Sequence, residues 1–310
     1  MESNIDIQEQ NENKKKNPYR KYIFKIVILL LLLTIVSIYM LLSYNPAPDK
    51  ASEMIIRQQA ARTVGKDPND LTNDDFETIS FIYIQGKELC DIKLLEKFTN
   101  LQELELYDIH FPSNKIPKWM KILAKLGVVN LSRIDVIDLN PIKKLYNLEK
   151  LTIRSTHVKN IKPLKGLLNL DGLDLNKTQV SDLGPLRGLN NLQVIFIEET
   201  QLSDIEPLKE LTNLQQLFIY NTQVSDFGPL AELINLRELS LNRTPISDLE
   251  PIKGLTNLEQ LYLNETEVSN LEPLKCLIKL RMLNISHCKN ITDQQVEDLK
   301  KALPELKIVR

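Results

Sequence analysis

Apolar residues recur along the second half of the chain with a fixed period of 22 residues. The first column of this repeat is a leucine, and its members are Leu148, Leu170, Leu192, Leu214, Leu236, Leu258 and Leu280. The fourth and sixth columns are apolar as well, as Leu217 and Ile219 illustrate. Side chains alternate between the two faces of a strand, so columns 4 and 6 point one way and columns 3, 5 and 7 the other. The pattern predicts one short strand in each unit.

The remainder of each unit is apolar at columns 11, 14, 17 and 20. One unit shows these columns as Val224, Phe227, Leu230 and Leu233. We therefore expect each unit to form one coil with its apolar residues turned inward. A single coil cannot cover such a core, whereas stacked coils cover it for one another.

The repeat continues upstream in a less regular form. Further units begin near Ile79, Leu101 and Leu126, which gives about ten units in total. The unit that begins at Leu101 is longer than the others, at 25 residues, and it contains most of the segment 111–126. We expect this segment to add a helical turn to the outer face.

Three polar or proline columns recur in register with the apolar ones. Proline stands at column 16 seven times, from Pro141 to Pro273, which suits the first turn of a short helix because that turn needs no proline N–H. Threonine recurs at column 9, where its hydroxyl can bond turn backbone between coils. Aspartate recurs at column 13, at Asp182, Asp204, Asp226 and Asp248. This row could bind Ca²⁺, but its position before a turn favours capping of backbone N–H groups.

Both ends of the repeat carry helix signals. Ile56, Ala60 and Val64 share one helical face, and a possible capping box follows within residues 71–79. At the other end, Thr292 and Gln295 have capping-box spacing and precede an amphipathic segment that stops at Pro304. We expect these segments to cap the two ends of one finished domain.

The recurring skeleton, written LxxLxLxxTxVSDLxPLxxLxNL, resembles the bacterial leucine-rich repeat family of the internalin-like, 22-residue type. The resemblance covers about residues 51–310 and departs from the commonest pattern at column 9, where threonine replaces asparagine. It implies an α/β solenoid: a leucine-rich repeat horseshoe with a concave parallel β-sheet. The implied organisation is an N-terminal cap at 51–78, repeats at 79–286 and a C-terminal cap at 287–310.

An apolar segment precedes the repeats. Ile26–Tyr44 holds 19 residues without a charge, which as a helix measures about 28 Å and matches a bilayer core. We predict a disordered basic tail at 1–22, one transmembrane helix at 23–44 and a linker at 45–50. The six Lys and Arg of residues 1–25 place the N-terminus in the cytoplasm and the repeats outside it, by the positive-inside rule. The alternative is a cleaved signal peptide, which has a shorter apolar core and a small-residue cleavage site.

Composition narrows the class of function. The net charge of −2 argues against a nucleic-acid partner. The three cysteines have no metal-ligand spacing, and we expect buried thiols, with one disulfide or a reactive thiol as the alternatives. The sequence holds no phosphate-binding loop, zinc-protease motif or nucleophile elbow, and its three histidines fall in different units. We therefore predict no enzyme, no cofactor and no metal site.

The outward strand columns hold the most informative positions. Column 5 reads Tyr83, Glu105, Asn130, Thr152, Asp174, Phe196, Phe218, Ser240, Tyr262, Asn284, so four of its ten members are aromatic. Together with columns 3 and 7 it predicts a partner-binding patch with a charged border, made of Val194, Phe196, Phe218, Tyr220, Tyr262, Glu198, Glu199 and Arg243. Aromatic clusters ringed by charge are typical of interfaces. Alternatively, these aromatics only pack across neighbouring strands.

The leading hypothesis is a membrane-anchored extracytoplasmic binding module that holds a protein on its concave face and contacts the lipid bilayer through Ile26–Tyr44. The alternative is a structural or glycan-binding component of the cell envelope, in which the aromatic side chains stack on sugar rings.

Overall fold

The computed structural model describes residues 50–86, 89, 91–109 and 137–310. All of them belong to one compact unit. The predicted tail, the predicted transmembrane helix and most of the linker lie outside these residues. None of the described helices is both long enough and apolar enough to cross a bilayer.

Parallel strands form a single sheet whose order in space equals their order in the sequence. The strands of the described residues are β1 (Phe81–Gln85), β2 (Glu103–Tyr107), β3 (Lys150–Thr152), β4 (Gly172–Asp174), β5 (Val194–Phe196), β6 (Gln216–Phe218), β7 (Glu238–Ser240), β8 (Gln260–Tyr262), β9 (Met282–Asn284) and β10 (Lys307–Val309). Each strand pairs with the next in register, so Leu217 lies between Ile195 and Leu239. The predicted parallel sheet of a stacked repeat is therefore confirmed.

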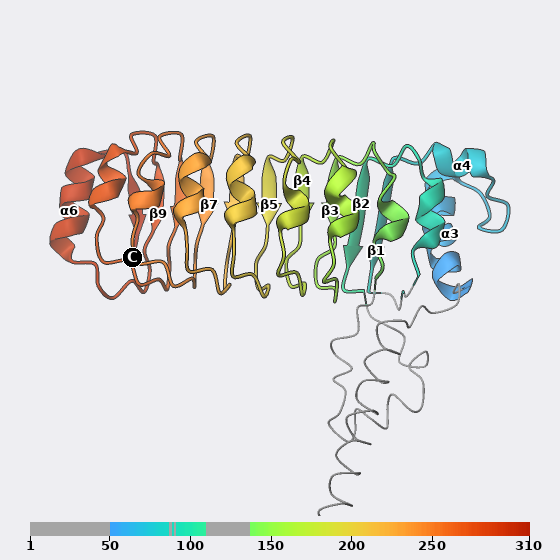
Figure 1. Ribbon diagram of the computed structural model, residues 1–310, viewed down its shortest axis with the longest axis horizontal. Helices are drawn as coiled ribbons and strands as arrows, with labels where there is room; N and C mark the ends of the chain where they lie inside the picture. The colour runs from blue at the N-terminus through green and yellow to red at the C-terminus, as the bar shows by residue number, and fades with distance from the viewer. Residues whose placement is uncertain (1–49, 87–88, 90, 110–136) are drawn as a thin grey trace, which may run out of the picture. The chain divides into compact units, whose positions relative to one another are not determined.

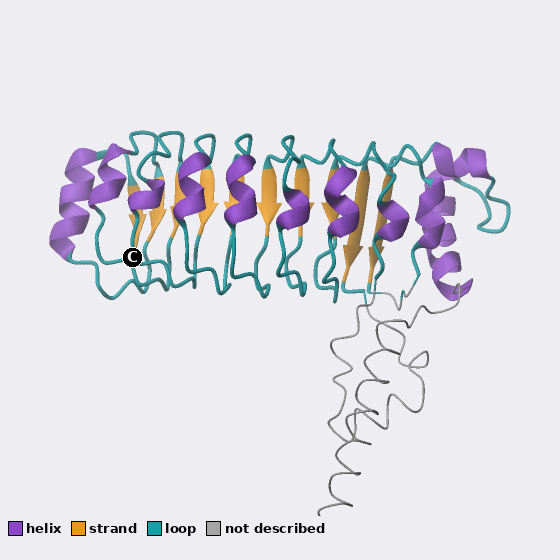
Figure 2. Cartoon of the chain, in the orientation of Figure 1, coloured by secondary structure: helices purple, strands orange, loops and turns teal. Residues whose placement is uncertain are grey.

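A row of short helices lies over one face of this sheet (Figures 1 and 2). These are 3₁₀ helices, one per coil: η1 (Lys93–Lys97), η4 (Asn140–Ile142), η5 (Lys162–Gly166), η6 (Gly184–Leu186), η7 (Glu206–Glu210), η8 (Gly228–Glu232), η9 (Glu250–Ile252) and η10 (Glu272–Cys276). The column-16 proline falls in the first turn of every one from η4 to η10, as the sequence predicts. A coil of 22 residues leaves room for only one tight turn of helix here.

The core lies between the sheet and the helices. Columns 4 and 6 of the strands and the apolar columns of the helical side are buried throughout; in one coil Leu217, Ile219, Val224 and Leu230 are all fully inaccessible. Burying an aliphatic side chain of this size stabilises the fold by about 1.5–3 kcal/mol. Because every coil contributes the same set, the core continues from one cap to the other.

One expectation about the number of coils is wrong. β2 pairs directly with β3, with Leu104 opposite Leu151, so no full repeat unit separates them in the sheet. Of the unit expected to begin at Leu126, the described residues hold the second half, which includes Leu139 and η4. Its expected strand, and the helical turn expected within 111–126, lie outside the described residues. The place of a tenth repeat strand is instead taken by β10 of the C-terminal cap.

Side-chain amides join neighbouring coils at the turn that precedes each strand. The asparagine before the column-1 leucine donates its side-chain N–H to a backbone carbonyl of the preceding coil. Asn213, for example, bonds the carbonyl of Asn190 at 2.8 Å, and Asn235 bonds that of Thr212 at 2.8 Å. We call this row of bonds between neighbouring coils the amide ladder, and it explains why an asparagine recurs at this position of the repeat.

The aspartate row of column 13 caps turns, as predicted. A carboxylate oxygen of Asp182 accepts the backbone N–H of Gly184 at 2.8 Å, and Asp204 accepts that of Glu206 at 2.8 Å. Each carboxylate thereby fixes the entry to a 3₁₀ helix and is occupied by its own turn.

The threonine row of column 9 differs from its predicted role. Thr178 donates its hydroxyl to the carbonyl of Leu175 at 2.6 Å, which is a bond within its own coil rather than between coils. Thr156, Thr244 and Thr266 repeat this geometry. In these four coils the hydroxyl therefore closes the turn that follows the strand.

The residue at column 8 adopts a left-handed backbone conformation in every described coil. Its φ lies between 50° and 62° in eight non-glycine residues, namely Asp108, Ser155, Lys177, Glu199, Asn221, Arg243, Glu265 and His287, and Gly86 has φ 60° at the same place. Only glycine adopts this conformation without steric cost. The eight coils with a non-glycine residue at this position therefore store some backbone strain where the chain leaves the sheet.

Helices close both ends of the stack. At the N-terminal end, α3 (Lys50–Val64) buries Ile56 and Ala60, and α4 (Asn73–Glu77) begins with a complete capping box. Lys66 donates a hydrogen bond to Asp75 of that box and holds the pKa of this carboxyl at about 2.

At the C-terminal end, α6 (Asp293–Ala302) begins with the predicted capping box of Thr292 and Gln295 and buries Val296 and Leu299. The expected capping helices are thus confirmed, whereas the strand β10 was not predicted.

Candidate partner-binding face

The candidate site is the face of the sheet that points away from the helices, which we call the open sheet face. It consists of the side chains at columns 3, 5 and 7 of each coil. The core side chains of the same strands point to the other side, so neighbours in sequence such as Leu217 and Phe218 separate into buried and half-buried positions. This alternation is what places the predicted site residues on one surface.

Two phenylalanines form the centre of the predicted patch. Phe196 and Phe218 are register partners on β5 and β6, and their rings stack with centroids 4.6 Å apart and an angle of 15° between the planes. Both side chains are half-buried, and Val194 lies two residues before Phe196 on the same face. The rings therefore pack across strands and also leave part of their surface accessible.

Tyr262 lies apart from this pair. In the register of column 5, Ser240 stands between Phe218 and Tyr262, so the two aromatic residues are two strands, or roughly 10 Å, apart. Ser240 is buried and accepts a hydrogen bond from Asn242 at 3.1 Å. The predicted patch is therefore interrupted by a small polar residue.

Tyr220 belongs to a second cluster at the edge where the strands end. The guanidinium of Arg243 lies 5.4 Å from the Tyr220 ring centroid and donates to its hydroxyl. Arg243 also pairs with Glu265 at 2.9 Å, and these hydrogen bonds and charges raise its pKa further. Glu199 pairs instead with Lys177 at 3.6 Å. Two of the three predicted border residues, Arg243 and Glu199, thus form ion pairs between adjacent coils.

Acidic side chains adjoin Phe196. Asp174 is its register partner on β4, and burial raises the pKa of this carboxyl, against the hydrogen bond from Asn176 and the charge of Arg154. Burial also raises the pKa of Glu198, which accepts a hydrogen bond from the side chain of Asn176 at 3.2 Å. The open sheet face therefore changes from apolar to anionic within one strand.

Several residues of the face were not singled out from the sequence. Glu238 accepts a hydrogen bond from Gln216 at 3.1 Å, and Gln260 accepts one from the hydroxyl of Tyr262 at 2.7 Å. Burial and the charge of Glu238 raise the pKa of Tyr262. Reading columns 3 and 7 with the same weight as column 5 would have found these residues, because all three columns share the face.

Within the described part of the chain, no three His, Cys, Asp or Glu side chains gather closely enough to hold a metal ion. Cys288 is buried and free, as expected, but Cys276 is exposed, because it ends a 3₁₀ helix on the solvent side. Cys90 lies outside the described residues.

Comparisons with known proteins agree with this architecture. A family model described as leucine-rich repeats in two copies matches residues 168–210, 190–232, 212–254 and 234–276. No curated protein matches the chain. Internalin C2 from Listeria monocytogenes, whose crystal structure is known, shares 30% sequence identity with this chain. The two structures align with a TM-score of 0.64 over 75% of this chain and 92% of internalin C2.

A second internalin of the same organism, InlF, shares 23% identity and a TM-score of 0.62, with 87% of this chain and 78% of that one covered, which shows a common fold. The matched repeats, the sheet with its 3₁₀ helices and the similarity to internalin C2 lead to one conclusion: the chain belongs to the leucine-rich repeat family, in its internalin-like form.

Proposed function

We propose that the protein is a membrane-anchored, extracytoplasmic binding module that holds a protein partner on the open sheet face. The observation that carries this proposal is the stacked pair of Phe196 and Phe218 at the middle of the sheet, with Val194 beside it. Aromatic side chains in a central position supply most of the binding energy of protein interfaces. A leucine-rich repeat fold is consistent with such an interaction module.

The surroundings of the pair suit a protein ligand. Carboxylates lie on one side, at Asp174 and Glu198, and the ion pair of Arg243 with Glu265 lies on the other. A charged border of this kind excludes wrong partners and fixes the register of the right one. Ser240 leaves a low point between Phe218 and Tyr262, where an apolar side chain of the partner could insert.

The proposal is tested by capture of a partner with the full-length chain. A variant with Phe196→Ser and Phe218→Ser should lose partner capture and still fold, with a lowered unfolding midpoint, because both rings are half-buried and no fully buried core residue is removed. The matched control replaces two exposed residues in the turns between a 3₁₀ helix and the next strand, Leu168→Ser and Ile234→Ser, and should capture the partner normally. If the sheet variant captures the partner as well as the wild type, the patch serves only as scaffold.

The membrane anchor is proposed from the sequence alone. Ile26–Tyr44 has the length and the absence of charge of a spanning helix, and basic residues precede it. In cells, the full-length chain should sediment with membranes and resist extraction at high salt. External protease should remove the repeats from intact cells. Recovery in the soluble fraction, or protection of the repeats from external protease, would contradict this topology.

A further inference from the structure

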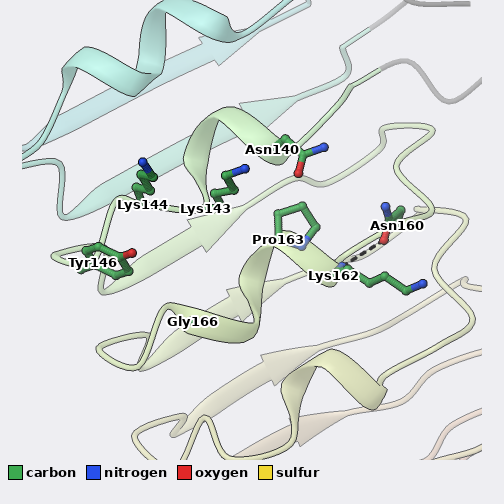
Figure 3. A pocket seen from close by; sticks show the side chains of 8 residues that line it. All are labelled: Asn140, Lys143, Lys144, Tyr146, Asn160, Lys162, Pro163 and Gly166. Atoms are coloured by element: carbon green, nitrogen blue, oxygen red, sulfur yellow. Dashed lines mark hydrogen bonds between the residues drawn. The ribbon is translucent and has the colours of Figure 1, made fainter.

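The helical side of the repeat carries its own charged hollow. It lies between η4 and η5, has a volume of about 450 Å³, and is lined by three lysines, two asparagines and an aromatic ring (Figure 3). This volume is within the roughly 300–1,000 Å³ that small-molecule sites usually have. The hollow is on the opposite side of the coil from the open sheet face, so it is independent of the proposed partner site.

The lysines of this hollow lack the partners that lysines have elsewhere on the helical side. In η7, η9 and η10, a glutamate at the first helical position pairs with a lysine three residues later, as in Glu206 with Lys209. In η4 and η5 the glutamate position holds Asn140 and Lys162 instead. Among the described residues, no carboxylate lies within ion-pair distance of Lys143, Lys144 or Lys162. The described residues therefore leave the positive charge of these three lysines without an ion-pair partner.

The local charge contrasts with that of the whole chain. Residues 137–166 contain seven Lys and Arg, of which Lys150 and Arg154 stand in the columns of the open sheet face; the other five compare with only two Asp and Glu in the segment, whereas the full sequence has a net charge of −2. One of the two carboxylates, that of Asp138, is already occupied by the backbone and side-chain N–H groups of Asn140. An anionic ligand would thus be attracted to this hollow rather than to the protein in general.

The remaining groups of the hollow suit a sugar. Tyr146 leaves 58% of its surface exposed, and a ring face can cover the C–H face of a pyranose. Gly166 keeps the space beside this ring open, since a Cβ there would stand 4.0 Å from the tyrosine Cε1. Asn140 uses its N–H₂ group on Asp138 and Asn160 uses its oxygen on the Lys162 N–H, so one amide presents an acceptor and the other a donor. Sugar hydroxyls require both.

From this juxtaposition we propose that Lys143, Lys144, Lys162 and Tyr146 form a binding site for an acidic polysaccharide. The lysines neutralise its carboxylate or sulfate groups, the tyrosine stacks on a sugar ring, and the two amides bind hydroxyls. A single small anion fits less well, because the donors are long, separate side chains on two coils rather than converging backbone N–H groups. A repeating acidic polymer places its charges at several points and matches this distribution.

The test measures binding of a fluorescent heparin-derived octasaccharide to the full-length chain by anisotropy at low salt. The Lys143→Gln, Lys144→Gln, Lys162→Gln variant should bind about tenfold more weakly or worse, because three ionic contacts are lost. The matched control removes three lysines of the other helices, Lys209→Gln, Lys253→Gln and Lys275→Gln, and so has the same net charge. It should bind within about twofold of the wild type, by the same electrostatic reasoning.

Tyr146→Ala separates sugar recognition from simple charge attraction. It should weaken octasaccharide binding several-fold, while binding of inorganic polyphosphate of similar charge stays unchanged. The proposal is overturned if both lysine variants lose affinity equally, if Tyr146→Ala has no effect on the octasaccharide, or if the wild type does not bind the octasaccharide. Partner capture on the open sheet face should be unaffected by all of these variants.

Discussion

Leu217→Ala should destabilise the protein much more than Phe218→Ala, although the two residues are adjacent on β6. Leu217 is fully buried between Ile195 and Leu239, so its truncation removes three carbons at about 0.8 kcal/mol each. The packed neighbours cannot fill the cavity, which brings the expected loss in the free energy of unfolding to about 3–5 kcal/mol. Phe218 is half-buried, and losing its stack on Phe196 costs about 1–2 kcal/mol.

Urea unfolding of the full-length chain, followed by far-ultraviolet circular dichroism, measures both losses. The midpoint for Leu217→Ala should fall clearly below that for Phe218→Ala, with similar slopes. Leu217→Asp should give no folded protein, since it buries an unpaired charge. Equal losses for the two truncations, or a soluble Leu217→Asp variant with a normal midpoint, would refute the assignment of column 4 to the core.

Three further predictions concern the turns and the charges. The backbone of Lys177 has a φ of 56°, which suits glycine and strains a β-branched residue. Lys177→Gly should therefore raise the free energy of unfolding by about 0.5–1 kcal/mol, and Lys177→Val should lower it by more than about 1 kcal/mol. If the glycine variant unfolds at a lower urea concentration than the valine variant, the turn is not strained. Asn213→Asp removes the donor to the carbonyl of Asn190 and should cost about 1–2 kcal/mol in the same assay, whereas an unchanged midpoint would mean that the amide ladder adds no stability. Since the folded-state pKa of Asp174 is raised, the folded state favours the protonated carboxyl, and stability is lost as pH rises through that pKa. Asp174→Asn should therefore raise the melting temperature at pH 7, and this gain should vanish at about pH 3. A gain that grows as the pH falls would contradict a raised pKa for Asp174.

Much of the site followed from the sequence, and its limits have a physical cause. Alternation along a strand assigns Phe196, Phe218 and Tyr262 to the same face without any coordinates, and that assignment is confirmed. The separation of Tyr262 from the phenylalanines was missed, because it depends on giving weight to Ser240, the small residue between them.

The lysine hollow shows the same limit on the helical side. Lys143 and Lys162 are 19 residues apart in the sequence, and only the stacking of coils brings η4 beside η5. No sequence motif marked this site, since each lysine alone is an ordinary surface residue. The contrast with Glu206 and Lys209 becomes meaningful only when equivalent positions of stacked coils are compared.

The sequence by itself determined the repeating coil, the inward residues, the turn-capping aspartates and the capping boxes, because these depend on local spacing within one 22-residue unit. The tertiary structure decided the direct pairing of β2 with β3, the entry of β10 into the sheet and the stacking of Phe196 on Phe218. These features depend on which coils are neighbours in the stack. The hydrogen bonds between coils that fix those neighbours form only in the folded protein. Local chemistry therefore set the shape of each coil, and contact between coils set the surfaces they present.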